Sequence, residues 1–460
     1  MRINFRRMNH DTPTAHADTI FALASAHGQS GVAVIRVSGT RAFESAKVIG
    51  IKKLQPQHSH LVRLYNPTTG EPIDHALTLP FRAPASFTGE DVVEYHLHGG
   101  RAVINALLEA LAHCDGHRMA EPGEFTRRAF ENNKLDLTEA EAVADLIHAE
   151  TAAQKNQALS QLGGSLSALY NQWGEQLKRA LAHLEADIEF PDEDMPDGIA
   201  PSILATINDL YQSLNAHLSD SRKGERLRDG LQVTIIGAPN AGKSSLLNVM
   251  AQRDIAIVSD MAGTTRDIIE AHLDIAGFPV ILSDTAGLRP DQIGQQGHDA
   301  VESEGIKRAI QRAKEADIKI LMFDAQQGQP DIHTLELIDD RSLIVINKCD
   351  QSVSPILSIK DALYISIKDN IGFPDLLKAL EVKIIAMMDI KSDTPSLTRQ
   401  RHRFAIEEAR DALNRALNAP LPELVAEDMR LAIRSLGRIV GRVDVEDLLD
   451  VIFKDFCIGK

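Results

Sequence analysis

Cysteine is scarce in this sequence, and long apolar runs are absent from it. Three cysteines among 460 residues, Cys114, Cys349 and Cys457, are too few and too scattered for a disulfide framework, which favours a reducing, cytoplasmic setting. No run approaches the ~20 apolar residues of a membrane-spanning helix, so we expect no membrane association. Residues 1–17 are partly basic and lack the apolar segment of a secretory signal, so we expect a disordered extension there.

Acidic residues outnumber basic residues in this sequence. It has 65 aspartates and glutamates but only 49 lysines and arginines, which gives a formal net charge of −16. This balance excludes nucleic-acid binding through a wholly basic surface. It does not exclude a local basic patch on this chain, or a partner protein that supplies one.

The chain ends in DFCIGK, so Cys457 stands four residues from the end, like the cysteine of a prenylation box. Gly459 occupies an aliphatic position of that box, Lys460 is not among its usual last residues, and the preceding stretch is acidic. A lipid anchor is therefore disfavoured, and the thiol needs another explanation.

The pattern of residues changes several times along the chain. Residues 18–134 alternate short β-like runs, such as GVAVIRVSG, HALTLPF and DVVEYHLHG, with turns and the helical run GGRAVINALLEALAH, which predicts an α+β domain. Residues 135–229 and 392–460 are helical in pattern, whereas residues 230–391 alternate strands and helices as a parallel sheet does. We expect a mostly parallel α/β domain inserted into an α-helical domain, with the α+β domain in front.

Two local patterns locate helices in the first helical stretch. Thr138 with Glu141 three residues later matches a capping box, which predicts a helix start at that point. A further helix is expected over residues 201–222. Between these positions, apolar residues recur at spacings of three and four and predict one buried helical face. They are Leu166, Leu169, Trp173, Leu177, Leu181, Leu184 and Ile188.

A phosphate-binding loop is predicted at GAPNAGKS, which fills the pattern G-x-x-x-x-G-K-[ST] from Gly237 to Ser244 between a predicted strand and a predicted helix. Glycines let backbone N–H groups wrap the phosphates, and the helix N-terminus adds its positive dipole end. Lys243 would reach the β- and γ-phosphates, and Ser244 would ligate Mg²⁺.

Guanine is predicted as the base by NKCD. Asp350 can accept two hydrogen bonds from the N–H edge of guanine, whereas adenine would leave its oxygens facing no donor. Asn347 would brace the base and the loop, and the stem of Lys348 would cover the base plane. The stretch SIK, Ser366 to Lys368, lies where a further guanine-contacting loop belongs.

Two more sequence motifs complete the predicted nucleotide site. DTAG, Asp284 to Gly287, would support Mg²⁺ and the γ-phosphate, and GTTRD would place Thr265 on Mg²⁺ as the switch threonine. The residues expected to contact GTP are Asn240, Ala241, Gly242, Lys243, Ser244, Ser245, Ser259, Asp260, Met261, Ala262, Gly263, Thr264, Thr265, Asp284, Thr285, Ala286, Gly287, Asn347, Lys348, Asp350, Ser366, Ile367 and Lys368. After DTAG stands Leu288, which cannot orient the attacking water as glutamine does in Ras-type enzymes, so another group must.

Together with the terminal FCIGK, FTGEDVVE and PGEFTRRAFENNKLDLTEAEAVADLI, these motifs resemble the MnmE/TrmE tRNA-modification GTPases. The resemblance covers nearly the whole chain past about residue 17. It implies a homodimer formed by folate-binding N-terminal domains and a heterotetramer with a flavin-dependent partner, MnmG/GidA. The two proteins would add an aminomethyl or carboxymethylaminomethyl group to carbon 5 of the wobble uridine of tRNA. The carbon would come from 5,10-methylene-tetrahydrofolate, for which 5-formyl-tetrahydrofolate would be an alternative ligand.

The same resemblance implies how hydrolysis proceeds without the glutamine. A K⁺ ion would stabilise the charge on the phosphates while G domains associate, with ligands from Asn240, Ser259, Met261 and Thr264. The catalytic, water-positioning acid falls on Glu302, with Glu304 as its rival because the preceding loop is long.

For folate, the resemblance points to Arg36, Glu94, Lys134 and Lys460, and it makes Cys457 the candidate thiol of the modification chemistry. The residues themselves leave two alternatives open. Glu94, His96 and His98 share one strand face and could bind a metal, and Cys457 could be a buried, inert cysteine. The other candidate functions are an Era-like ribosome-assembly GTPase, which should carry a basic RNA-binding domain, and a folate-dependent one-carbon enzyme regulated by its G domain.

Overall fold

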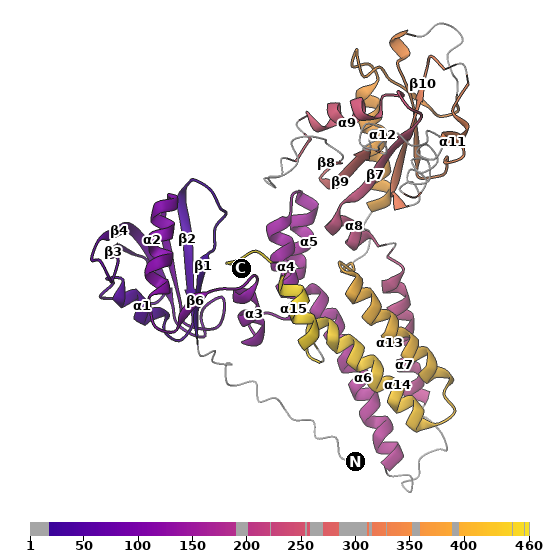
Figure 1. Cartoon of the computed structure of the whole chain (residues 1–460). Coiled ribbons are helices and arrows are strands. Elements are labelled where there is room, and N and C mark those ends of the chain that lie inside the picture. Colours follow the sequence, from indigo (N-terminus) through magenta and orange to yellow (C-terminus); the bar gives the residue numbers. More distant parts are fainter. Residues whose placement is uncertain are drawn as a thin grey trace, which may run out of the picture. The chain divides into compact units, whose positions relative to one another are not determined.

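The computed structural model (Figure 1) consists of two compact units, one formed by Met1–Ala144, Gln161–Asn208 and Asp411–Lys460 and the other by Asp145–Ser160 and Asp209–Arg410. The structure describes residues 18–189, 201–220, 222–253, 255–257, 270–284, 311, 315–327, 329–351, 359–388, 395–443, 445–454 and 456–459. Among these residues, no helix combines the length and the apolar character needed to cross a membrane.

A six-stranded sheet in the order β3-β4-β5-β2-β1-β6 forms the N-terminal part of the first unit. Its strands are β1 (Thr19–Leu23), β2 (Ser30–Ser38), β3 (His60–Tyr65), β4 (Pro72–Phe81), β5 (Val92–Gly99) and β6 (His117–Met119). Neighbouring strands are antiparallel except β1 and β6, which are parallel. The three strands and the helix predicted for this part of the chain are confirmed.

Side chains along β2 and β5 point alternately to the two faces of the sheet, and this decides which of them are available for binding. Ile35 and Tyr95 point into an apolar core against α1 (Ala42–Val48) and α2 (Arg101–Ala112). Successive side chains of a strand face opposite sides of its sheet, so Arg36 and Glu94 emerge on the other face. The antiparallel register pairs Arg36 directly with Glu94.

The helices of the first unit include α3 (Glu124–Glu131), α4 (Leu137–His148), α6 (Ser165–Glu189), α14 (Pro422–Val440) and α15 (Glu446–Lys454), while α7 (Pro201–Leu218) and α13 (Gln400–Asn418) run from one unit to the other. Leu166, Trp173, Leu177 and Leu184 of the predicted stripe are buried on α6. This helix packs against α14, and Glu185 accepts hydrogen bonds from Arg430 at 2.6 and 3.1 Å. Helices from before and after the α/β domain therefore pack together, as an inserted domain requires.

Two helix boundaries differ from the prediction. α4 is capped by Asp136, not by Thr138: its Oδ1 accepts from the backbone N–H groups of Thr138 (2.8 Å) and Glu139 (3.0 Å), and Glu139 accepts from the N–H of Asp136 (2.8 Å). Starting there buries Leu137 and Ala140 in an apolar cluster with Phe453, which favours the earlier of two possible capping boxes. α7 ends at Leu218, before the turn that leads into α8 (Lys223–Asp229).

The second unit contains the α/β domain, with the strand order β12-β11-β10-β7-β9-β8. Its strands are β7 (Leu231–Gly237), β8 (Glu270–Ile275), β9 (Phe278–Asp284), β10 (Ile318–Asp324), β11 (Ser342–Asn347) and β12 (Leu363–Tyr364). All neighbours are parallel except β8 and β9. Helices α9 (Lys243–Ala251) and α12 (Phe373–Met388) share one apolar cluster with the sheet, and α11 (Ile332–Leu335) packs against a second.

The carboxyl ends of the parallel strands define the ligand-binding edge of this sheet, as in other open α/β sheets. β7, β9, β10 and β11 end at Gly237, Asp284, Asp324 and Asn347. Three of these four positions belong to the motifs predicted to bind GTP.

Candidate functional site

The predicted phosphate loop connects β7 to α9 in a conformation that depends on glycine. Gly242 has φ 105°, and a Cβ at this position would lie 2.3 Å from Nδ2 of Asn347. Asn240 also has a positive φ, 63°, a conformation that asparagine tolerates better than most residues. The loop thus bends tightly and brings α9 to the strand edge with its N-terminus free to meet anions.

Lys243 is folded into this loop. Its Nζ donates to the carbonyl oxygens of Gly237 and Ala238, both at 2.9 Å, and the residue is only 8% exposed. Burial lowers the pKa of Lys243, and the carboxylate of Asp284 partly opposes that effect. The ammonium group is therefore held among loop atoms, where phosphate oxygens would offer it a stronger, charge-assisted partner.

Ser244 and Asp284 meet at the position expected for Mg²⁺. The hydroxyl of Ser244 donates to Oδ2 of Asp284 at 2.6 Å, and Asp284 is buried at the end of β9. A hydroxyl and a carboxylate this close together fit a hard cation that prefers oxygen ligands. Thr265, the other predicted ligand, lies outside the described residues.

Asn347 joins the phosphate loop to the predicted guanine loop. Its Nδ2 donates to the carbonyl oxygen of Ala241 at 2.8 Å, and its Oδ1 accepts from the backbone N–H of Ile367 at 3.3 Å. With Asn347 only 3% exposed, one buried amide fixes the distance between two loops that are far apart in sequence. The structure thus brings together NKCD, SIK and the phosphate loop.

The carboxylate predicted to recognise guanine is held in its ionised form. A hydrogen bond from Ser366 is the main influence that keeps the pKa of Asp350 below its ordinary value, and Lys368 adds to it. Lys348 has φ 65° and forms a 2.6 Å ion pair with Asp324. Asp324 was missed in the sequence, although a carboxylate at the end of a predicted parallel strand was a usable signal.

Many of the predicted nucleotide, ion and catalytic residues, and one predicted folate residue, lie outside the described residues and remain predictions. They are Ser259, Asp260, Met261, Ala262, Gly263, Thr264, Thr265, Thr285, Ala286, Gly287, Glu302, Glu304 and Lys460. Of the four predicted K⁺ ligands, the structure describes Asn240.

Arg36 and Glu94 form the centre of the predicted folate site. Nε of Arg36 lies 2.9 Å from Oε1 of Glu94, and both side chains are partly exposed. The guanidinium group also stacks on Phe87, 5.1 Å from the ring centroid, and on Phe125, at 5.6 Å. Flat aromatic and guanidinium surfaces beside a carboxylate suit a planar ligand with N–H donors along its edge, as a pterin ring is.

The competing metal hypothesis is not supported. Nδ1 of His98 binds Asp74 at 2.8 Å, and Glu94 is engaged by Arg36. Within the described part of the chain, no group of three or more histidine, cysteine, aspartate or glutamate side chains could hold a metal ion.

The C-terminal segment docks on the same α+β domain. The carbonyl oxygen of Cys457 accepts from the N–H of Gly123 at 3.4 Å, and Ile458 forms a β-bridge with Pro122. Gly459 has φ 97° and packs so closely that a Cβ would lie 2.1 Å from the carbonyl oxygen of Leu23. Leu23 pairs with Ile35, the neighbour of Arg36 in sequence, so the tail reaches the strands of the candidate folate site. Cys457 itself is exposed, which disagrees with the alternative of a buried, inert cysteine.

Comparison with known proteins settles the family. A model described as the MnmE helical domain matches residues 137–457, and one described as the GTP-binding protein TrmE N-terminus matches residues 19–134. The tRNA modification GTPase MnmE of Paramagnetospirillum magneticum is 50% identical over 449 residues, covering 96% of this chain and 100% of that protein. Its namesake from Rickettsia bellii is 48% identical over 450 residues, with the same coverage. This chain belongs to the MnmE family.

Solved structures outside the MnmE family add little. The G domain of the T. maritima FeoB iron transporter is 20% identical and covers 34% of this chain and 98% of its own, with a TM-score of 0.23. The cytosolic domain of FeoB in a GDP form is 18% identical and covers 49% and 94%, also with a TM-score of 0.23. Such scores do not establish a shared fold, whereas the order and direction of the strands here define the parallel α/β domain directly.

A buried arginine of the α+β domain was also missed in the sequence. Arg128 is 1% exposed and binds three carboxylates, those of Asp18 (2.9 Å), Glu124 (2.9 Å) and Glu90 (3.2 Å). Burial tends to raise the pKa of Glu124, but hydrogen bonds led by that from Arg118 hold it below its usual range. The EFTRRAF motif of this MnmE-family chain therefore anchors α3 to the loop that carries Glu90. The tandem arginines gave no sign of which one would be buried.

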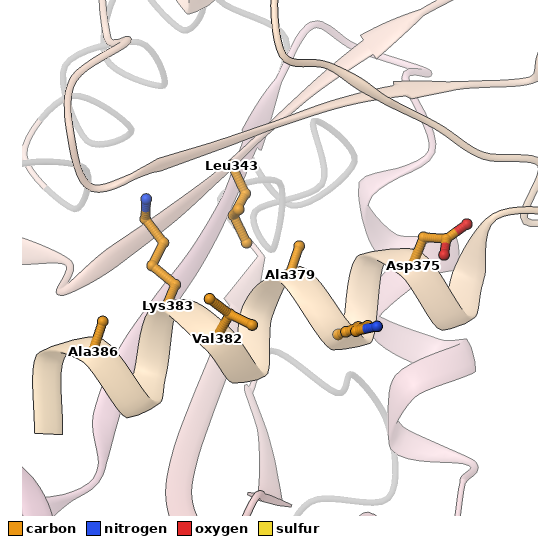
Figure 2. Close-up of a pocket in the computed structure, with 7 residues that line it drawn as sticks. Leu343, Asp375, Ala379, Val382, Lys383 and Ala386 are labelled. Atoms are coloured by element: carbon orange, nitrogen blue, oxygen red, sulfur yellow. The ribbon is translucent and has the colours of Figure 1, made fainter. Parts of the chain in front are cut away.

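A shallow apolar pocket of about 540 Å³ lies along α12, as Figure 2 shows. Its lining residues are Leu343, Asp375, Lys378, Ala379, Val382, Lys383 and Ala386. None of these residues belongs to a motif of the MnmE family named above, and the pocket is separate from the predicted nucleotide residues.

Proposed function

We propose that this chain is a K⁺-stimulated GTPase that acts with a flavin-dependent partner of the MnmG/GidA type to modify carbon 5 of the wobble uridine in tRNA. The group added is aminomethyl or carboxymethylaminomethyl, and its carbon comes from 5,10-methylene-tetrahydrofolate. The observation that carries the nucleotide part is the pair of Asn347 hydrogen bonds, which tie the guanine loop to the phosphate loop. The tRNA part is supported by family membership along the whole chain.

In the nucleotide site, each described residue has one task. Lys243 neutralises the β- and γ-phosphates, and Asp350 accepts the N–H groups of guanine. Ser244 would ligate Mg²⁺ together with Thr265, with support from Asp284. Asn240, with Ser259, Met261 and Thr264, would hold the K⁺ that offsets charge on the phosphates. Glu302, or Glu304 in its place, would orient the attacking water.

In the α+β domain, Arg36, Glu94, Lys134 and Lys460 would bind the folate, whose pterin edge and glutamate tail match opposite charges. The exposed thiol of Cys457 would take part in the modification chemistry beside it. We further propose a homodimer through this domain, a heterotetramer with the flavin protein, and a cytoplasmic location.

GTP hydrolysis in KCl against NaCl, at equal ionic strength, is the first test. We expect several-fold faster hydrolysis in KCl, and we expect Asn240→Ala to remove most of the difference because it deletes a cation ligand. Asn414→Ala, at an exposed position of α13, serves as the control and should keep the difference. Equal rates in both salts would exclude the K⁺ mechanism and favour an assembly GTPase that awaits an external activator.

A further inference from the structure

The predicted guanine-contacting stretch SIK forms a closed turn between β12 and α12. Ser366 and Ile371 exchange backbone hydrogen bonds in both directions, each at 3.0 Å, and so close the turn Ile367–Asn370 between them. Asn370 is the last residue of this turn and has φ 56°, a conformation that asparagine tolerates better than most residues. The two ends of this SIK turn, Ser366–Ile371, are therefore held together, and a contact at one end constrains the other.

The first half of the SIK turn is anchored to the rest of the predicted nucleotide site. The backbone N–H of Ile367 donates to Oδ1 of Asn347 at 3.3 Å, and the hydroxyl of Ser366 accepts from the N–H of Asp369 at 3.2 Å. Ser366 also donates to Asp350, the carboxylate predicted to recognise guanine. The position of the turn therefore determines how that carboxylate is oriented.

The second half of the SIK turn is anchored by Arg253, two residues beyond the end of α9. Nη2 of Arg253 donates to Oδ1 of Asn370 at 2.7 Å. The guanidinium carbon lies 3.8 Å from the ring centroid of Phe373, the first residue of α12. A guanidinium group can only donate, so the oxygen of the Asn370 amide must face it. Stacking on the ring and the hydrogen bond together fix the plane of the guanidinium group.

Helix α9 connects this anchor to the phosphate loop, because it begins at Lys243 within that loop. Its residues Leu246, Leu247 and Met250 are buried in the same apolar cluster as Phe373. A packed helix thus separates the lysine predicted to bind phosphates from the arginine that holds the SIK turn. Side chains that support a binding group from behind, locked by packing and hydrogen bonds, determine how precisely that group is placed.

We propose that Arg253 is a positioning residue for guanine recognition: by holding Asn370, it keeps the SIK turn at a fixed distance from the phosphate loop. Through Ser366, the turn in turn orients the carboxylate of Asp350. The proposal rests on the guanine recognition proposed above, and it assigns a role to a residue outside every motif identified in the sequence. Because Arg253 acts through the turn, its loss should change the choice of base more than the binding of phosphates.

The test is binding of GDP and of inosine diphosphate (IDP), each with Mg²⁺, to the full chain and its variants by titration calorimetry. Hypoxanthine keeps the ring N–H of guanine but lacks its 2-amino group, so the ratio of the two affinities reports how well Asp350 reaches both donors. Arg253→Ala removes the hydrogen bond and the stacking. We expect GDP binding to weaken ~10-fold, IDP binding to weaken less, and the preference for GDP to narrow at least ~3-fold.

Three further variants isolate the contact. Asn370→Gly removes the acceptor while accepting the positive φ, so it should narrow the preference similarly and add little to Arg253→Ala. Arg253→Lys keeps a charge and a donor and should restore part of the preference. Arg341→Ala is the matched control. This arginine binds Asp339 (3.2 Å) and the carbonyl oxygen of Ala316 (3.1 Å) at the amino end of β11, away from the ligand-binding edge, so its loss should keep the preference.

The outcomes separate positioning from mere structural support. A lower melting temperature of Arg253→Ala, with GDP and IDP binding weakened equally, would overturn the inference, because the residue would then only support the fold. Unchanged binding of both nucleotides would overturn it as well, and so would a full preference for GDP in Asn370→Gly. If the unaltered chain binds GDP and IDP equally, the guanine recognition of the proposed function fails together with the inference. If the unaltered chain prefers GDP and every variant keeps that preference, the inference fails alone.

Discussion

Asp350 lies in a single 3₁₀ turn, Cys349–Gln351, directly after the buried Asn347 that ends β11. Its carboxylate is partly exposed, while Asn347 and the hydrogen bond from Ser366 fix the surrounding loops. In the proposed mode of binding, one side chain on a rigid support would recognise the base, so single-residue changes should alter specificity without disturbing the fold.

The substitution Asp350→Asn tests whether this one carboxylate determines the choice of base. Guanine offers two donors, which a carboxylate accepts, whereas an amide offers one acceptor and one donor and thus complements xanthine. We expect the affinity for GTP to fall at least ~100-fold and hydrolysis of XTP to appear, measured with both nucleotides under identical salt. Asp340→Asn, at an exposed position in the same unit, should leave both activities unchanged. An unaltered preference for GTP would show that Asp350 does not contact the base.

At the scale of elements, the C-terminal segment is attached by backbone geometry as well as by side chains. Phe453 and Phe456 bury their rings at 5.4 Å between centroids in the cluster with Leu137. Beyond them, Gly123 and Gly459 allow backbone contacts that no other residue would permit, since each has a positive φ and a Cβ would collide with a carbonyl oxygen. The two glycines thus determine where Cys457 is presented.

Gly459→Ala should release the end of this segment. The added methyl would collide with the carbonyl oxygen of Leu23, and alanine also disfavours φ 97°, so we expect a cost of ~1–3 kcal/mol in local docking. Hydrogen exchange should become faster at the N–H groups of Gly123 and its neighbours. Gly31→Ala, in the same domain but with open space around its Cβ, is the control. Equal exchange in both variants would show that Gly459 does not hold the segment.

At the scale of the whole molecule, the two proposed ligands belong to different compact units. Arg36, Glu94 and Lys134 lie in the first unit, and the phosphate loop lies in the second. A ligand that binds only the native form of a unit stabilises that unit by mass action, by ~2.7 kcal/mol when present at 100 times its dissociation constant.

Calorimetry of the full chain should therefore show two transitions that respond to different ligands. A non-hydrolysable GTP analogue with Mg²⁺ should raise one melting temperature by a few degrees, and 5-formyl-tetrahydrofolate should raise the other. Adding EDTA with the nucleotide should reduce only the first shift, because it would remove the Mg²⁺ that we propose Ser244 and Asp284 help to hold. A single transition that either ligand raises equally would contradict independent units.

Much of the fold and of the candidate site could be predicted from the sequence, because these features depend on residues that are close together in the chain. The phosphate loop is contiguous, so one pattern specified its glycine, its lysine and its hydroxyl together. Strands β2, β4 and β5 follow from short runs of β-forming residues, and α6 follows from the spacing of its apolar face. The same local information failed at α4, where two capping boxes overlap and burial of Leu137 and Ala140 chose between them.

The sequence by itself determined the order of domains, the type of nucleotide and the family, since each depends on residue types at fixed spacings. The tertiary structure decided which distant residues meet. Asp324 reaches Lys348 only because β10 and β11 are neighbours in the sheet, and Asn132 reaches Thr88 only because α3 ends beside the Pro84–Glu90 loop. Such pairs depend on strand order and packing, which long-range apolar burial fixes and no local pattern encodes.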